Sequence, residues 1–139
     1  IGDIIASTSK LKGTTIKGSL IPRLIDEIPV ISIAAAFAKG KTVIKDAKEL
    51  RVKETDRIKT ITKNLKRIGI KVIEKEDGMI IYGNNMIPFK YADIDSFGDH
   101  RIAMAFSIAA LVGDNGLLIK DIDCVNTSFP NFFRILNNL

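Results

Sequence analysis

The sequence predicts a mixed α/β fold, of the α/β or α+β class, with helices packed on a mixed sheet. Segments with the apolar spacing of helices alternate with short β-rich segments. The alternation also repeats: Ser32–Ala35 (SIAA) recurs as Ser107–Ala110, and Ile44–Asp46 (IKD) recurs as Ile119–Asp121, each 75 residues later. Finally, 139 residues with 46% apolar side chains are enough for one typical domain with its own core.

The shared register of the two matches indicates a duplicated strand–helix–strand–helix unit. We therefore expect two units, at about 1–75 and 76–139, that pack helices on sheet. No linker separates them, so the sequence predicts a single domain over residues 1–139. The chain begins with Ile1 and has neither an initiator Met nor an apolar leader, as a piece of a longer protein would.

In the first unit, two short strands are expected at Asp3–Thr8 and Leu11–Lys17, followed by a connector at Ser19–Pro22. Apolar residues three or four positions apart then predict a helix over Asp26–Lys39. Gly40 follows this helix at the position where glycine commonly ends helices.

The alternation continues along the chain. Lys41–Lys45 is β-rich and predicts a strand, and Thr55–Ile68 has the clearest helical apolar stripe of the chain. Thr55 is expected to cap that helix. Two further strands, Lys71–Glu74 and Met79–Tyr82, flank an Asp-Gly pair that is typical of a hairpin turn.

The second unit is expected to follow the same order. A strand is predicted at Tyr91–Asp95, a helix at His100–Val112, a strand at Leu117–Lys120 and a last short helix at Phe132–Leu139. Three aromatic residues near this last helix are expected to belong to the core: Phe129, Phe132 and Phe133.

The charge is concentrated in one place. The chain has 21 basic and 16 acidic residues, a net charge of +5. The window from Arg51 to Lys75 has nine basic and three acidic residues, whereas the rest of the chain has 12 basic and 13 acidic ones. An anionic partner is therefore expected at this window, and a nucleic acid, a lipid or a small phosphate ester would each qualify.

Several classes of protein are excluded by composition. No apolar run reaches the roughly 18 residues of a membrane span. The single cysteine, Cys124, excludes an internal disulfide framework, and the single histidine, His100, excludes a multi-His metal centre within this chain. Cys124 has no basic neighbour in sequence, so we expect a buried structural thiol and not a nucleophile.

The segment Arg51–Arg57 (RVKETDR) is the first candidate site, because it leads into the start of a predicted helix. Lys53 and Arg57 are cations near a helix N-terminus, where the helix dipole disfavours them unless an anion lies between. An anion bound there would raise the proton affinity of Glu54, which makes Glu54 a candidate acid/base group. The alternative is a solvated surface helix start.

The second candidate is Gly98–Arg101 (GDHR), again at a helix start. Asp99 is expected to cap the helix, Arg101 could hold a carboxylate or phosphate with two hydrogen bonds, and His100 could shuttle a proton. Asp26 is the third candidate, either as a general base for a substrate hydroxyl or, on its position alone, as a plain helix cap.

These segments resemble one enzyme family. Leu24–Pro29 (LIDEIP), Arg51–Arg57, Gly98–Met104 (GDHRIAM) and Ser128–Pro130 (SFP) are similar to 3-phosphoshikimate 1-carboxyvinyltransferases, the enolpyruvylshikimate-phosphate synthases, in type, order and spacing. The resemblance covers nearly the whole chain. It implies that the chain is the last two units of the C-terminal domain of a two-domain enzyme about three times as long. It also implies that the fold is part of an inside-out α/β barrel.

The resemblance implies an activity and residue roles. Members transfer the enolpyruvyl group of phosphoenolpyruvate to the 5-hydroxyl of shikimate 3-phosphate, through a tetrahedral intermediate, without metal or organic cofactor. Asp26 then corresponds to the carboxylate that binds and deprotonates the hydroxyl, and Glu54 to the group that protonates the methylene carbon. The remaining residues correspond to substrate-binding positions: Lys53 for shikimate 3-phosphate, and Arg57, His100 and Arg101 for phosphoenolpyruvate.

The resemblance also sets limits. Thr127 lies where some members have a phosphoenolpyruvate-binding lysine. The N-terminal domain is not in this chain, so we expect the chain alone to be inactive, and we expect the enzyme to be cytoplasmic, with no nucleic-acid or membrane partner. Three alternatives stay open: a sister enzyme with a UDP-sugar acceptor, a small basic nucleic-acid-binding module, and a chain that self-associates through exposed apolar surface.

Overall fold

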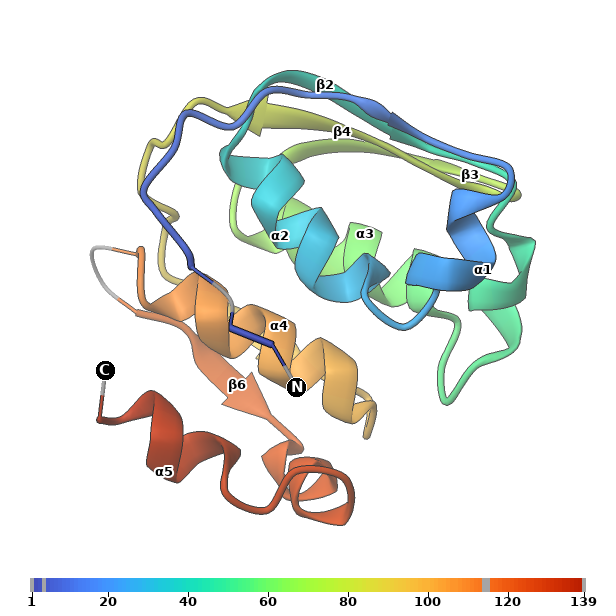
Figure 1. Cartoon of the computed structure of the whole chain (residues 1–139). Helices are drawn as coiled ribbons and strands as arrows, with labels where there is room; N and C mark the ends of the chain where they lie inside the picture. Colours follow the sequence, from blue (N-terminus) through green and yellow to red (C-terminus); the bar gives the residue numbers. More distant parts are fainter. Residues whose placement is uncertain (1, 4, 114–115, 139) are drawn as a thin grey trace.

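A computed structural model describes residues 2–3, 5–113 and 116–138 of the chain. It has the mixed helix and strand content that the sequence predicts (Figure 1). The strands are β1 (Thr15–Ile16), β2 (Lys39–Ile44), β3 (Lys71–Lys75), β4 (Gly78–Asn84), β5 (Asp93–Asp95) and β6 (Leu118–Lys120). The α-helices are α1 (Leu20–Leu24), α2 (Ile28–Phe37), α3 (Arg57–Arg67), α4 (His100–Ala110) and α5 (Phe132–Leu136), with 3₁₀ helices η1 (Lys48–Val52) and η2 (Ile122–Thr127).

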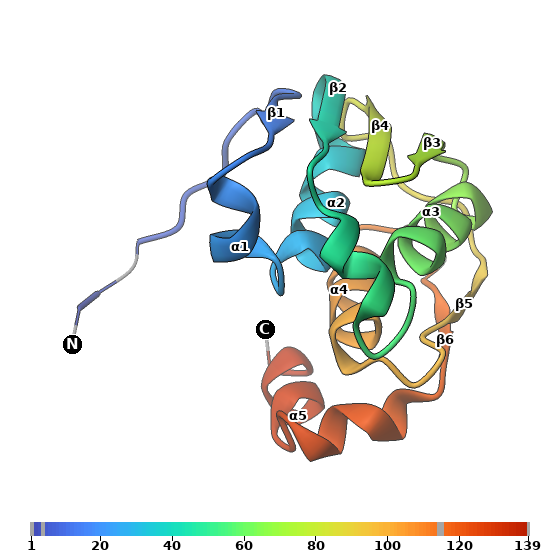
Figure 2. The same cartoon turned by 90° about the vertical axis from the view of Figure 1, so that its right-hand side faces the viewer.

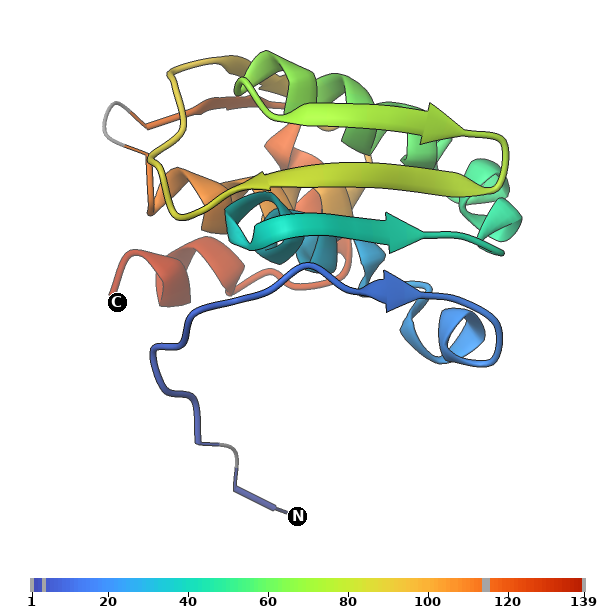
Figure 3. The same ribbon diagram turned by 90° about the horizontal axis from the view of Figure 1, so that it is seen from above.

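The larger sheet has the strand order β1-β2-β4-β3, and the view from above shows its four strands side by side (Figure 3). β1 pairs with β2 in parallel, whereas β4 pairs antiparallel with both β2 and β3. The sheet is therefore mixed, as expected. The hairpin predicted at the Asp77-Gly78 turn is confirmed as β3–β4, and because β4 pairs with β2, both of its strands belong to the first sheet.

The repeat is visible in the strand registers. In the first sheet Ile16 pairs with Ile44, and in the two-stranded second sheet Ile94 pairs with Ile119, again in parallel. Ile44 and Ile119 are 75 residues apart, as are the first residues of α3 and α5. The order strand–helix–strand–helix thus occurs twice, as β1–α2–β2–α3 and β5–α4–β6–α5, although the first residues of β1 and β5 are 78 apart and those of α2 and α4 are 72 apart.

The helices pack beneath the larger sheet. α2 and α3 lie against its strands, and α4 packs against both α2 and η2 (Figure 1). One continuous apolar core joins the two halves, with Ile28, Ile58, Leu65, Ile94 and Phe106 fully buried. The apolar stripe of α3 faces this core, and as a result the start of α3 lies next to the starts of α2 and α4.

Several predicted boundaries are wrong. Residues 5–8 form no strand; they extend away from the body of the molecule with exposed side chains (Figures 2 and 3). Ile4, which the predicted strand also included, lies outside the described residues. Ser19–Pro22 is not a connector, because α1 begins at Leu20. Gly40 does not end α2 but lies inside β2 with a φ of 93°, a conformation that glycine adopts without strain.

The aromatic residues near α5 are not core residues. Phe132 makes edge-to-face contacts with Phe129 and Phe133, yet no residue of α5 is buried and Phe129 is 43% exposed. Figure 2 shows α5 at the lower end of the molecule, below α4 and away from the larger sheet. The helix predicted at Phe132–Leu139 ends at Leu136, and Leu139 lies outside the described residues. Of the helices described, none combines the length and apolarity needed to cross a membrane.

Candidate active site

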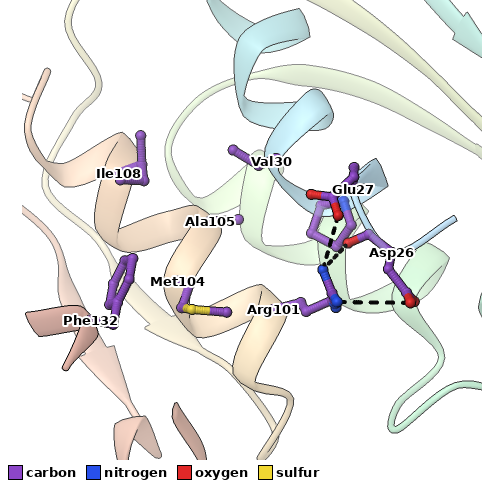
Figure 4. Close-up of a pocket in the computed structure, with 9 residues that line it drawn as sticks. Asp26, Glu27, Val30, Arg101, Met104, Ala105, Ile108 and Phe132 are labelled. Atoms are coloured by element: carbon purple, nitrogen blue, oxygen red, sulfur yellow. Dashed lines mark hydrogen bonds and ion pairs between the residues drawn. The ribbon is translucent and has the colours of Figure 1, made fainter. Parts of the chain in front are cut away.

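Asp26 lies in the turn between α1 and α2, where the chain reverses before entering α2. It does not cap α2, because Glu27 holds the N-cap position and neither side chain bonds the free amides. Pro29 near the start of α2 lacks an amide hydrogen, so the first turn has one donor fewer to satisfy. The Asp26 carboxylate instead points toward the starts of α3 and α4 (Figure 4). The cap interpretation of Asp26 is therefore wrong.

The segment RVKETDR forms the entry to α3. Asp56, and not Thr55, caps this helix: its carboxylate accepts a hydrogen bond from the Lys59 amide at 3.0 Å. Arg51 donates to Asp56 at 2.8 Å and to Glu74 of β3 at 2.9 Å, and so ties the segment to the hairpin. The helix therefore begins at Arg57, and Lys53 lies four residues before it, in the segment that leads into the helix. The Arg57 side chain is directed into the protein.

Arg57 is the centre of the site, and its side chain is completely buried. Its guanidinium donates from Nη1 to Asp26 at 3.0 Å, from Nη2 to Glu54 at 2.6 Å and from Nε to Asp99 at 2.8 Å. The charge expected to attract an external anion is thus balanced by carboxylates of the protein itself. Asp26 and Glu54 remain 46% and 47% exposed, so these two carboxylates are the accessible face of the cluster.

Asp99 is also fully buried and links Arg57 to α4. As predicted, it caps the helix, accepting hydrogen bonds from the amides of Arg101 at 3.0 Å and Ile102 at 3.4 Å. The same carboxylate accepts from Arg57 and, at 3.3 Å, from the Thr55 hydroxyl. The sequence shows the capping position of Asp99 but not its ion pair with Arg57, because only the packing of α3 on α4 brings the two together.

Arg101 approaches Asp26 from α4, as Figure 4 shows. It donates from Nη1 to the Asp26 carbonyl oxygen at 3.0 Å and to the Glu27 carboxylate at 3.3 Å, and Nη2 lies 3.8 Å from the Asp26 carboxylate. Asp26, Glu27 and Arg101 line one side of a pocket of about 160 Å³. The other side of this pocket is apolar and includes Val30, Met104, Ala105, Ile108 and Phe132. His100, the first residue of α4, is half-buried beside Arg101.

Lys53 completes the group of cations. Its ammonium lies 2.8 Å from Glu49 and 3.9 Å from the Asp26 carboxylate. Glu49 was not among the predicted site residues, although a carboxylate four positions before a lysine is a recognisable pairing signal. The structure therefore brings Asp26, Glu54, Lys53, Arg57 and Arg101 into one cluster, with His100 adjacent through its place in the chain.

These contacts set the charge states. Burial raises the pKa of Asp26, but the hydrogen bond from Arg57 and the charges of Arg101 and Lys53 outweigh it, so the pKa lies below its ordinary value. Burial alone would lower the pKa of Arg57, yet its bond to Asp99 raises it above the usual range. Asp26 is consequently ionised at neutral pH, and Arg57 stays charged although it is buried.

The basic window divides into two faces. Arg51, Lys53 and Arg57 turn toward carboxylates of the protein. The exposed side of α3 carries its remaining basic residues: Lys59, Lys63, Lys66 and Arg67. Only part of the window is thus available to an anion at the candidate site.

Other candidate groups lie apart from this cluster. Within the described ranges, no set of three or more His, Cys, Asp or Glu side chains is arranged to hold a metal ion. Cys124 is half-buried; burial raises the pKa of its thiol, which agrees with a structural role. Thr127 is exposed at the end of η2, where its hydroxyl donates to the Cys124 carbonyl oxygen at 2.7 Å.

Comparison with known proteins agrees with the motifs. The family model of EPSP synthase (3-phosphoshikimate 1-carboxyvinyltransferase) matches residues 2–136. Proteins named 3-phosphoshikimate 1-carboxyvinyltransferase from Petrotoga mobilis and Thermoanaerobacter pseudethanolicus are 53% and 54% identical over all 139 residues, which cover 32% of each relative. An EPSP synthase structure from Acinetobacter baumannii superposes with a TM-score of 0.89 at 43% identity, over 93% of this chain and 30% of that one.

The chain therefore spans about a third of the length of the curated relatives it matches. The match extends over both repeated units and includes every segment that forms the cluster around Arg57. High identity over the whole chain, together with the superposition, confirms the fold expected from the resemblance. The chain belongs to the EPSP synthase family.

Proposed function

We propose that the protein of which this chain forms a part transfers the enolpyruvyl group of phosphoenolpyruvate to the 5-hydroxyl of shikimate 3-phosphate, with release of phosphate. The observation that supports this most directly is the position of Asp26 and Glu54. Both carboxylates are held by one buried guanidinium, at 3.0 and 2.6 Å, and both remain about half exposed. Two accessible carboxylates at a cationic cluster suit a reaction that moves protons on anionic substrates.

In this proposal Glu54 donates a proton to the methylene carbon of phosphoenolpyruvate while the shikimate hydroxyl adds to the neighbouring carbon. Asp26 binds that hydroxyl and accepts its proton. The tetrahedral intermediate then loses phosphate, which leaves with the proton that Asp26 had accepted. Glu54 takes back a proton from the new methyl group, which forms the enol ether of the product and returns both carboxyl groups to their starting states. No cofactor is needed, because the two carboxylates supply and remove every proton that the sequence of steps requires.

The cations hold the anionic groups. Arg101 is assigned to phosphoenolpyruvate, which its 31% exposure and its position in the pocket lining support. Lys53, whose ammonium lies 3.9 Å from Asp26, is assigned to shikimate 3-phosphate. His100 is assigned to the phosphoenolpyruvate side. Arg57 is assigned there as well, because its Nη1 and Nη2 would face the substrate once Asp26 and Glu54 change partners. Anionic substrates that draw Arg101 and Lys53 away from Asp26 would raise the pKa of Asp26, and so strengthen it as a base when substrates are bound.

The second wall of the active site is assigned to a further domain of the longer protein, which we expect to be its N-terminal domain. The half-exposed carboxylates and the open pocket beside Arg101 support this assignment. Closure of two domains would exclude water from the intermediate. A cytoplasmic location belongs to the same proposal, and the family match favours the shikimate acceptor over a UDP-sugar acceptor.

The proposal is tested with the full-length protein by measuring phosphate release from phosphoenolpyruvate and shikimate 3-phosphate. We expect turnover by the wild type and a fall in kcat of about 100-fold or more for E54Q and for D26N, since each removes a proton-transfer group. The matched control is E76Q, because the Glu76 side chain is 83% exposed and its carboxylate pairs with the surface residue Lys48. Activity with a UDP-sugar but not with shikimate 3-phosphate would overturn the proposal.

A further inference from the structure

We infer that Asp99 is a positioning residue of the active site, which acts through Arg57. Its carboxylate fixes one edge of the buried guanidinium, so that the other edge faces Asp26 and Glu54. The inference rests on the function proposed above, and it assigns to Asp99 a role beyond that of a helix cap.

The geometry of Arg57 separates the two edges. Asp99 binds the side edge, formed by Nε and Nη2, and accepts from Nε at 2.8 Å and from Nη2 at 3.4 Å. Asp26 and Glu54 bind the end of the guanidinium, at Nη1 and Nη2. Because the guanidinium is planar and rigid, an acceptor that fixes the side edge also fixes the direction of the end. The spacing of Asp26 and Glu54 therefore depends on a bond that neither of them makes.

Burial separates the partners in the same way. The side chains of Arg57 and Asp99 are both 0% exposed, whereas Asp26 and Glu54 are about half exposed and can change partners when substrates arrive. An ion pair withdrawn from water contributes little net stability compared with apolar residues of similar volume. It does hold both groups in one arrangement, because separating them would leave two unpaired buried charges.

The charge of Asp99 is not required by its capping role. Asn and Ser cap helices about as well as Asp does, so the bonds to the Arg101 and Ile102 amides could be made by a neutral residue. The ion pair between Asp99 and Arg57 is also not a common feature of the two repeated units, because the corresponding positions have no charge. In the 75-residue register Leu24 corresponds to Asp99 and Phe132 corresponds to Arg57. The ion pair is thus specific to the place where α3 and α4 meet at the site.

The test is a double-mutant cycle in the full-length protein, with D99N, R57K and the double variant, measured where circular dichroism shows each to be folded. D99N keeps a capping side chain but removes the charge. We expect D99N and R57K each to lower kcat about tenfold or more, and the double variant to lie within about twofold of R57K alone. D93N is the control, because Asp93 forms an exposed pair with Lys120 of β6.

A kcat of D99N within twofold of wild type would overturn the inference. It would also be overturned if the fold reduction in kcat of the double variant equalled the product of the two single reductions, because that is the result expected if Asp99 acts independently of Arg57. D99S, which also caps without a charge, replaces D99N if that variant does not fold. If neither folds, hydrogen exchange of the Arg57 Nε–H is followed by NMR in the wild-type chain. Exchange much slower than that of the exposed Arg134 supports the inference, and equal exchange overturns it.

The two proposals fail in different ways. If the wild-type protein turns over neither substrate, the proposed function is wrong, while the NMR measurement still decides whether Asp99 holds the Arg57 guanidinium. If the wild type is active and D99N is unimpaired, the function stands and the role assigned to Asp99 is wrong.

Discussion

Arg57 shows how one side chain can organise a group of acids. It is a fully buried arginine that bonds three carboxylates from three different segments of the chain. A guanidinium has five N–H donors in one plane, so it can bond several acceptors at fixed angles, which a lysine ammonium cannot reproduce. The site is therefore assembled around a cation that water does not reach.

Removing this cation should strongly destabilise the fold. We expect R57M to lower the free energy of unfolding by about 3–5 kcal/mol, because it leaves the buried Asp99 carboxylate without its partner. R101M is the comparison: Arg101 is 31% exposed, and its loss should cost about 1 kcal/mol or less. Urea unfolding of the chain measures both, and equal effects of the two variants would contradict the burial-based argument.

Asp26 should make stability depend on pH in the acidic range. Its pKa in the folded protein is lower than in the unfolded chain, so its ion pairs stabilise the fold at pH values above the unfolded pKa of about 3.9. This contribution is lost as the pH falls through the folded pKa. The difference in unfolding free energy between wild type and D26N should therefore be constant from pH 6 to about 8 and shrink below about pH 4. A constant difference down to about pH 2 would contradict this.

The elements show where local signals determined a boundary. α3 and α4 each begin with a capping aspartate, and each predicted helix was found close to its predicted range. In α3 the cap is Asp56 and not Thr55, one residue later than expected. Both residue types are good caps, so the choice between them depends on the path of the chain entering the helix.

The identity of this cap can be measured. D56A should lower the free energy of unfolding by about 1 kcal/mol, because the Lys59 amide loses its acceptor and Arg51 loses a partner. D123A, at an exposed position in η2, should change it by less than about 0.5 kcal/mol. Thermal or urea unfolding decides; a loss for D56A no larger than that for D123A would exclude Asp56 as the cap.

β4 depends on a glycine where it passes α2. A Cβ atom at Gly83 would collide with the backbone carbonyl oxygen of Ala38, just after α2 ends. We expect G83A to lower the free energy of unfolding by about 2 kcal/mol, because backbone cannot move aside as a flexible side chain can. At Gly2 the same change meets no atom within 4 Å, so G2A should have no measurable effect on unfolding.

At the scale of the whole molecule, the cluster lies where three helix starts meet, and it faces outward. Arg57 and Asp99 are enclosed, while Asp26, Glu54 and the pocket beside Arg101 are open. The chain thus contains one wall of the proposed active site. A wall of this kind can bind an anion weakly, but it does not surround a reacting substrate or exclude water from it.

The isolated chain should therefore bind phosphate but not catalyse. We expect no phosphate release from phosphoenolpyruvate and shikimate 3-phosphate by the 139-residue chain alone. A phosphate titration followed by NMR should shift the amides near Arg101 and Lys53, and the shifts should weaken with added salt. Turnover by the isolated chain would contradict the first expectation, and amides that do not move would contradict the second.

Much of this molecule follows from local sequence. Apolar spacing predicted α2, α3 and α4, the Asp77-Gly78 pair predicted the hairpin, and the repeated segments predicted the duplicated unit. The segments near the ends were predicted less well: residues 5–8 are extended without strand pairing, and the aromatic residues near α5 are not buried. Strand pairing and burial there depend on neighbours that a local pattern does not specify.

The sequence also predicted that a group of charged residues from distant segments would lie together, and the structure shows this for Asp26, Lys53, Glu54, Arg57 and Arg101. The arrangement of these residues was not predicted. The sequence does not show that Arg57 is buried, that Asp99 pairs with it, or that Asp26 caps no helix. The composition and periodicity of the chain determine its elements and its charged groups. Which charge is withdrawn from water, and beside which partner, is decided only when α2, α3 and α4 pack, because ion pairs and desolvation depend on distances between segments far apart in the chain.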